Sequence, residues 1–254
     1  MNDEKTNQTS FVEHLTELRS RLVKSFIYLF IFFAICFFFA ENIYAFLVEP
    51  YANAVKNDEI NRRLIFTALQ ETFITYLKVA FFTAIFVASP LILTQIWKFI
   101  APGLYKNEKR ALLPYLIATP TLFLLGGMLV YYLVMPLAIN FFLSFETSAQ
   151  INSLPIQLEA KVNEYLSLIM RLIFAFGISF QLPVLLTLLA RVGFIDSEYL
   201  KKRRKYVIVI IFAVAAILTP PDPITQIGLG IPLLILYELS IFSVKIVEKR
   251  KKDA

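Results

Sequence analysis

The chain has 254 residues, of which 58% are hydrophobic, and its formal net charge is +6. Its mean hydropathy of +0.67 is well above that of a soluble domain, so most residues are expected to face lipid or other buried helices. A single cysteine and a single histidine exclude a disulfide framework and argue against a zinc site. We expect an integral membrane protein with no cofactor.

The sequence predicts six membrane-spanning helices in one integral membrane domain, residues 1–254. Most of the apolar runs approach or exceed the roughly 20 residues that a helix needs to cross about 30 Å of hydrocarbon. They are predicted at residues 22–40, 73–97, 112–135, 165–189, 206–218 and 224–241. The fifth run would be only about 20 Å long as a helix, and the sixth lacks strongly polar residues only over 227–236. We therefore expect an all-α bundle whose fifth and sixth helices are short.

Lysine and arginine are distributed unevenly between the two sides of these spans. Most of the 25 lie in the N-terminal segment, the second-to-third and fourth-to-fifth connections, and the C-terminal segment. The opposite connections hold only Lys56, Arg62, Arg63 and Lys161. Because basic residues near span ends are retained in the cytoplasm, this distribution predicts that both termini are cytoplasmic.

Capping and turn signals divide the chain further. The residues SFVE from Ser10 fit a capping box, which predicts that a helix starts at Ser10. The connection 41–72 is long and polar enough to hold short helices. Pro183 predicts a kink in the fourth span. Other prolines are expected to mark turns at Pro50, Pro155 and residues 220–223.

Two carboxylates near the predicted cytoplasmic face each have two interpretations. Glu17 precedes Arg21 by four residues, a spacing that gives a surface ion pair worth a few tenths of a kcal/mol. Glu108 follows Asn107, a residue suited to cap a helix, and would favour that helix start. Alternatively, both carboxylates bind a cationic ligand. Arginine fits such a site best, because its guanidinium donates two parallel bonds to a carboxylate.

Strongly polar residues inside the hydrocarbon are costly and usually face a partner or a cavity. Within the predicted spans they are Lys78, Arg171, Gln181 and Glu238. The first two lie nearer span ends and can extend to the interface. Gln181 and Glu238 lie deeper and are expected to bond to other helices. The sequence has no phosphate-binding glycine loop, HExxH or GxSxG element, so it does not predict an enzyme.

Four stretches spread over nearly the whole chain resemble the TatC family, the receptor component of the twin-arginine protein translocase. They are HLTELRSRL at 14–22, FIAPGLYKNEKR at 99–110, FAFGISFQLP at 174–183 and LTPPD at 218–222. Their order, their spacing and the number of spans match the family. The resemblance implies a curved, glove-shaped bundle of six helices.

The resemblance also implies a cytoplasmic site that binds the paired arginines of a signal peptide on folded cargo. Glu17 and Glu108 would face the two arginines. The other residues assigned to this site are Phe99, Leu104, Tyr105 and Arg19. Contacts with single-span partners of the TatA and TatB kind are expected at Gln181 and Glu238, although the family often has glutamate where this chain has Gln181. Structural roles are expected for Pro50, Pro183 and Asp222.

From this resemblance we predict a translocase receptor in the bacterial inner membrane. It would self-associate and export folded proteins with the proton-motive force, and it would not bind nucleic acid. One alternative is a proton-coupled transporter of small solutes that uses Glu238, Arg171 and Lys78 as a relay. A second alternative is a scaffold in which Glu17 and Glu108 only cap and pair helices.

Overall fold

The computed structural model describes residues 2–56, 62–104, 113–147, 154, 156–219 and 222–252. Regular structure in these ranges is helical, which confirms the predicted all-α class. The elements in chain order are α1 (Asn2–Phe38), α2 (Ala40–Val55), α3 (Glu71–Leu104), α4 (Leu113–Leu129), the π-helical turn η2 (Val130–Val134), α5 (Met135–Leu143), α6 (Val162–Ser179), α7 (Leu182–Val192), α8 (Ser197–Leu218) and α9 (Pro223–Lys252).

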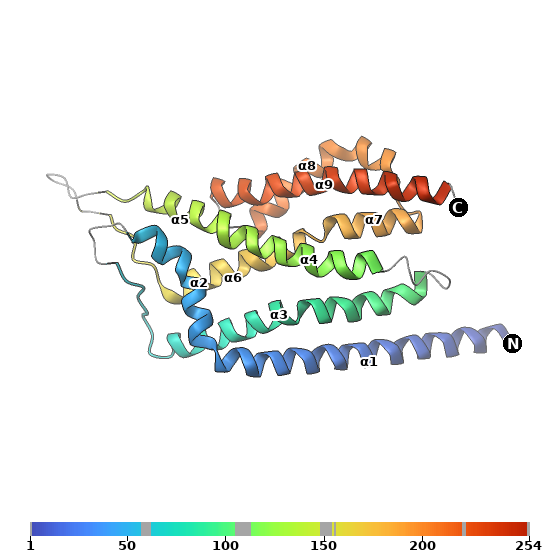
Figure 1. Cartoon of the computed structure of the whole chain (residues 1–254), viewed down its shortest axis with the longest axis horizontal. Helices are drawn as coiled ribbons and strands as arrows, with labels where there is room; N and C mark the ends of the chain where they lie inside the picture. The colour runs from blue at the N-terminus through green and yellow to red at the C-terminus, as the bar shows by residue number, and fades with distance from the viewer. Residues whose placement is uncertain are drawn as a thin grey trace.

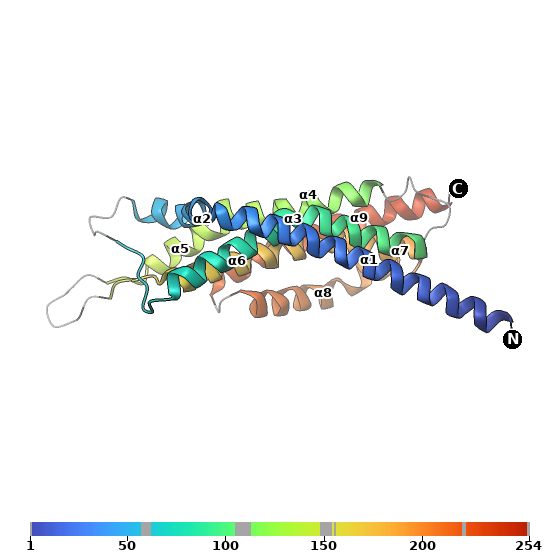
Figure 2. The same ribbon diagram turned by 90° about the horizontal axis from the view of Figure 1, so that it is seen from below.

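The long helices lie side by side along the longest axis of the molecule (Figure 1). Both chain termini lie at one end of this bundle, which we call the terminal end. The opposite end, which we call the loop end, carries α2 and the connecting residues 62–70 and 156–161. Seen from below, the bundle is flattened and α8 lies to one side of it (Figure 2). The chain is therefore a broad, shallow bundle with two distinct ends.

Among the described residues, five segments are long and apolar enough to cross a membrane, and each overlaps a predicted span. They are Leu15–Phe38, Glu71–Ile96, Pro114–Leu143, Val162–Val192 and Pro223–Lys249. The remaining predicted span, 206–218, is the apolar half of α8, which follows the cationic run 201–205 in the same helix. The fifth and sixth helices were expected to be short, but α8 has 22 residues and α9 has 30, because each helix continues beyond its apolar run into polar residues. The protein is thus a multi-pass membrane protein.

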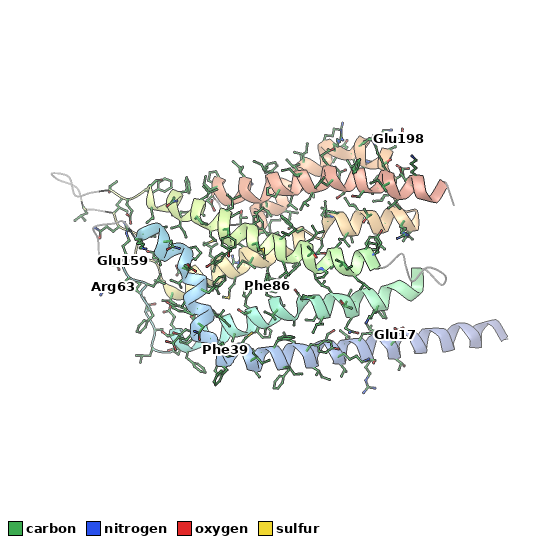
Figure 3. All side chains as sticks on the ribbon, viewed as in Figure 1. Glu17, Phe39, Arg63, Phe86, Glu159 and Glu198 are labelled. Carbon is green, nitrogen blue, oxygen red and sulfur yellow. The ribbon has the colours of Figure 1, made fainter. Side chains whose placement is uncertain are left out.

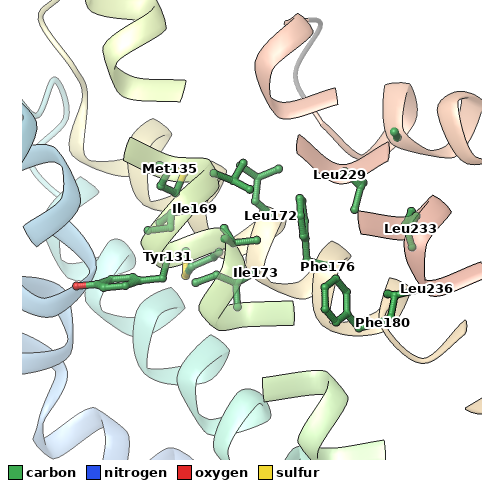
Figure 4. Packing of buried hydrophobic residues seen from close by; sticks show 14 of the residues in the cluster. Tyr131, Met135, Ile169, Leu172, Ile173, Phe176, Phe180, Leu229, Leu233 and Leu236 are labelled. Atoms are coloured by element: carbon green, nitrogen blue, oxygen red, sulfur yellow. The ribbon is translucent and has the colours of Figure 1, made fainter. Parts of the chain in front are cut away.

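Helix α6 forms the centre of the bundle. Leu166, Ile169, Leu172 and Phe176 are fully buried along it. Figure 4 shows the last three among residues of η2, α5 and α9 in the same apolar cluster. Half of the apolar window of the α6–α7 segment is buried, against 6% for the window in α1. Most of α1 is therefore left to face lipid or a partner.

The backbones of α4 and α6 approach closely at two glycines. A Cβ atom at Gly126 would lie 2.8 Å from the carbonyl oxygen of Phe176, and one at Gly177 would lie 2.7 Å from the Phe123 ring. Small residues permit such close approach between membrane helices, where van der Waals contact drives association. These glycines therefore allow α4 and α6 to pack closely.

Two predictions about helix ends are wrong. Helix α1 begins at Asn2, so Ser10 lies inside a helix and does not start one. Pro50 lies inside α2, which continues to Val55, so it does not mark a turn. A proline leaves the carbonyl four residues earlier without its helical donor. Here that carbonyl belongs to Phe46, and it accepts the Tyr131 hydroxyl at 2.8 Å.

The interruption predicted at Pro183 is present. Helix α6 ends at Ser179 and α7 begins at Leu182, with Pro183 in the first turn of α7, where its missing N–H costs nothing. The predicted short helix in the connection 41–72 is also present, as α2. Other predictions fall on residues outside the described ranges: Tyr105, Asn107, Glu108, Pro155, Pro220 and Pro221.

Side chains tie the loop end together. The Arg62 guanidinium donates to both carboxylate oxygens of Glu146, at 2.6 and 2.5 Å, and Glu146 also accepts the Leu158 N–H at 2.6 Å. These bonds lower the pKa of the Glu146 carboxyl, and the bonds from Arg62 have the largest effect. The Tyr165 hydroxyl of α6 donates to the Leu47 carbonyl of α2 at 3.0 Å. Helix α2 is thus anchored across the end of the bundle.

Candidate functional site

A polar network joins α1 to α3 in the part of the bundle nearer the terminal end. The guanidinium of Arg21 donates to Glu17 at 3.0 Å through one nitrogen and to Gln95 at 3.1 Å through another. Glu17 and Arg21 are one helical turn apart, so both lie on the face of α1 that packs along α3. Figure 3 labels Glu17 on that stretch of α1. We call these three residues the α1–α3 network.

The three members of the network differ in exposure. Gln95 is 8% exposed, whereas the side chains of Arg21 and Glu17 are 27% and 33% exposed. The buried Gln95 oxygen therefore accepts from the Arg21 guanidinium on the side that faces the bundle. Glu17 is the outermost acceptor and remains accessible to a ligand that approaches from outside.

Sequence reasoning missed Gln95. It lies inside the predicted span 73–97 but close to its end, a position that does not by itself indicate a partner. Its position four residues before Phe99, on the same face of α3, was the available signal. Phe99 is partly buried.

The other residues predicted for this site are only partly accounted for. Arg19 is exposed on α1, and Leu104 is the last residue of α3. Tyr105 and Glu108 lie outside the described residues, so the predicted pairing of Glu17 with Glu108 stays a prediction. The structure brings Glu17 together with Arg21 and Gln95.

Gln181 lies at the break between α6 and α7. Its side-chain nitrogen donates to the Thr119 carbonyl of α4 at 2.9 Å and approaches the Gly177 carbonyl at 3.4 Å. Its side-chain oxygen is buried and accepts no hydrogen bond from the residues that the structure describes. A buried acceptor without a donor is costly, so Gln181 has unused capacity for a donor on another helix.

The residues proposed for a proton relay are not brought together. Lys78 donates to Asn163 at 2.8 Å, between α3 and the start of α6. Glu238 accepts from Arg204 at 2.6 Å, between α9 and α8. Arg171 is exposed on α6. The transporter interpretation is therefore not favoured.

Asp222 caps α9. The buried carboxylate accepts the Thr225 N–H at 2.7 Å and also the Thr225 hydroxyl. A side-chain acceptor at this position satisfies one of the first free N–H groups of a helix. The geometry is that of a structural residue in the short link between α8 and α9.

Within the part of the chain that the structure describes, no group of three or more His, Cys, Asp or Glu residues could hold a metal ion.

Comparison with known proteins identifies the family. The profile of the family described as "Sec-independent protein translocase protein (TatC)" matches residues 13–232. A relative of that name from Magnetococcus marinus is 46% identical and covers 100% of this chain and 90% of its own length. Another from Rickettsia prowazekii is also 46% identical and covers 94% of both chains.

A solved structure gives the same result. The crystal structure of the "Twin Arginine Translocase Receptor" TatC aligns with a TM-score of 0.76 and 39% sequence identity, covering 92% of this chain and 99% of that one. The same receptor crystallised in DDM aligns at a TM-score of 0.75. The chain therefore belongs to the TatC family of protein translocase components.

Proposed function

We propose that this protein is the receptor of a twin-arginine translocase and binds the paired arginines of signal peptides at its terminal end. The observation that carries the proposal is the α1–α3 network. Glu17 already binds a guanidinium at 3.0 Å, and a third of its side chain is exposed. A protein translocase component of this family is not an enzyme.

The network explains how an arginine of a peptide could be selected. A carboxylate accepts two parallel bonds from a guanidinium but only point contacts from an ammonium. If a peptide arginine displaces Arg21 from Glu17, the bond from Arg21 to Gln95 remains, so the displaced guanidinium keeps a buried acceptor. Exchange of one guanidinium for another then leaves Arg21 with a hydrogen-bond acceptor and Glu17 with a cation.

The charge distribution supports an orientation in which the terminal end faces the cytoplasm of a bacterium. The cationic run 201–205 lies in the first half of α8 near this end, and the C-terminal part of α9 is also basic. Both features follow the retention of basic residues in the cytoplasm. The membrane would be the bacterial inner membrane.

Partner subunits of the translocase would pack against polar positions within the membrane. The unsatisfied oxygen of Gln181 supports one such contact, with a donor on a single-span subunit of the TatA or TatB kind. Glu238 is half exposed, and its bond to Arg204 leaves room for a second contact. In this proposal folded cargo crosses in an assembly of these subunits with further copies of the receptor, driven by the proton-motive force.

Binding of a labelled twin-arginine peptide to the detergent-solubilised protein tests the receptor proposal. We expect Glu17→Gln, Glu108→Gln and a twin-lysine peptide each to weaken binding by about 10- to 150-fold, the equivalent of about 1.5–3 kcal/mol for a charge-assisted bond. Glu198→Gln is the matched control, because it removes the same charge from the first turn of α8, away from the network. Equal binding by the wild type, the three variants and the twin-lysine peptide would mean that Glu17 only pairs with Arg21 within its helix.

A further inference from the structure

Polar side chains join α8 to α9 along one line of contacts toward the terminal end, which we call the α8–α9 seam. At the start of α8, the N–H and the hydroxyl of Ser197 both donate to Glu248 of α9, each at 2.6 Å. Farther along α8, the Arg204 guanidinium donates to Glu238 of α9 at 2.6 Å. Each of these contacts joins a donor to a carboxylate, so both favour the pairing of the two helices.

The contact between these two joins a lysine to a lysine. Lys201 lies one turn after Ser197 in α8, and Lys245 lies one turn before Glu248 in α9. The two amino groups are close enough for a hydrogen bond between them, and this contact, together with repulsion between the charges, lowers the pKa of Lys201. Glu198 opposes this effect only in part. Neither lysine forms an ion pair with another residue that the structure describes.

Two other cations in this part of α8 lie over tyrosine rings. The Arg203 guanidinium is 5.3 Å from the ring centroid of Tyr199 and 5.7 Å from that of Tyr206. The Lys205 ammonium is 5.0 Å from the Tyr206 centroid. A cation over an aromatic face is favourable, whereas Lys201 meets a charge of its own sign. Two like charges in contact oppose the pairing of α8 with α9 unless an anion lies between them.

The two lysines lie where a membrane changes from headgroups to hydrocarbon. The apolar run 206–218 of α8 begins five residues after Lys201, which is a rise of about 7.5 Å. Exposed apolar side chains continue from the lysines on both helices. Ile208, seven residues after Lys201, is 43% exposed, and Phe242, three residues before Lys245, is 63% exposed. An anion bound here would therefore lie beside a surface that suits an acyl chain.

We propose that an anionic phospholipid binds at the α8–α9 seam, with its phosphate between the amino groups of Lys201 and Lys245. Each ammonium then donates to a phosphate oxygen, so a repulsive contact becomes two charge-assisted bonds. An acyl chain lies along Ile208 and Phe242. Arg204, whose side chain is half exposed, adds positive potential that disfavours a headgroup with its own cation. The site is separate from the α1–α3 network and does not depend on the peptide binding proposed above.

Native mass spectrometry with phospholipids of identical acyl chains, carrying glycerol or choline headgroups, tests the proposal. We expect the wild type to bind the anionic glycerol lipid about 10-fold more tightly than the choline lipid. Lys245→Glu places a carboxylate beside Lys201 and should abolish this preference. Lys202→Glu is the matched control, because it makes the same change of charge at an exposed neighbour of Lys201, and it should keep most of the preference. Equal losses in the two variants would show diffuse attraction and overturn the proposal.

Thermal unfolding in a nonionic detergent separates the seam from the surrounding charge. Lys245→Glu should raise the unfolding temperature without added lipid, because an ion pair replaces a like-charge contact. The glycerol lipid should then stabilise the wild type but not this variant. Lys245→Gln removes the repulsion without adding an anion, and it should also abolish the stabilisation by lipid.

Inorganic phosphate distinguishes a lipid site from a site for a free anion. Because it has no acyl chain, it should not displace the glycerol lipid from the wild type. Displacement by inorganic phosphate would contradict the lipid assignment. Equal stabilisation of the wild type by the glycerol and choline lipids would contradict it as well, because the two lysines would then not select an anionic headgroup.

Discussion

The two ends of the bundle use charged side chains differently. At the loop end, the Arg62 and Glu146 side chains are 8% and 17% exposed, and the pair is bidentate. Toward the terminal end, Glu17 and Arg21 are about one-third exposed, and Arg204 and Glu238 are about half exposed. The buried Arg62–Glu146 pair at the loop end serves the protein's own structure, whereas these pairs toward the terminal end remain within reach of a ligand.

Stability and ligand binding therefore depend on different ends of this fold. Buried polar groups stabilise only when each is matched, and removing one partner leaves the other unpaired at high cost. Exposed ion pairs contribute little to stability because water and salt screen them. Substitutions at the loop end should therefore change stability, and those at the terminal end should change binding.

The largest effect on stability is expected for Arg62→Leu. It leaves Glu146 with the Leu158 N–H and without its bidentate partner, so we expect a loss of about 2–3 kcal/mol in the free energy of unfolding. Unfolding by SDS titration in mixed micelles measures it. Arg63→Leu, which removes an exposed neighbouring cation, is the control and should change stability by less than about 0.5 kcal/mol. Equal losses would mean that the pair is not the source of the loop end's stability.

A smaller effect is expected for Tyr165→Phe. The tyrosine is buried and donates to Leu47 in α2, so its loss leaves a buried carbonyl without that donor and should cost about 1–2 kcal/mol. The same SDS titration measures it. Tyr132→Phe removes a hydroxyl from a side chain that is 70% exposed and should leave stability unchanged. An equally large loss of stability for Tyr132→Phe would show that the effect of Tyr165→Phe does not come from its bond to α2.

Sequence patterns predicted the elements of this fold better than its contacts. Apolar runs predicted six membrane helices, of which five overlap the long apolar segments of the described residues, and Pro183 predicted the break between α6 and α7, because both signals are local. Pro50 was misread because the donor that rescues its turn of helix, Tyr131, comes from a segment 85 residues away from Phe46. Gln95 was missed because its partner Arg21 is 74 residues away. Local patterns carry no information about such contacts.

The loop end should also depend on pH through Glu146. Its pKa is lowered from an ordinary value of 4.5, chiefly by the bonds from Arg62. The stabilisation is therefore fully present above pH 4.5 and is lost as pH falls through the lowered pKa of the folded state. SDS titrations of the wild type and Glu146→Gln should show the largest difference in stability at neutral pH. The difference should shrink in acid, and a constant difference would show that the charge of Glu146 contributes nothing.

The smallest effect on stability is expected for Glu17→Gln. The Glu17–Arg21 pair is an i,i+4 contact on a partly exposed helix face, which is worth about 0.3–0.5 kcal/mol. Gln95 would still hold the Arg21 guanidinium at its buried side, and the new amide oxygen could still accept from it. SDS titration should place this variant within about 0.5 kcal/mol of the wild type.

The same variant should lose most of its affinity for a twin-arginine peptide, so one substitution separates peptide binding from stability at the terminal end. A large loss of stability would mean that Glu17 is a structural residue like Glu146. Weakened peptide binding would then report a damaged fold, and the contrast between a self-sufficient loop end and an available terminal end would fail.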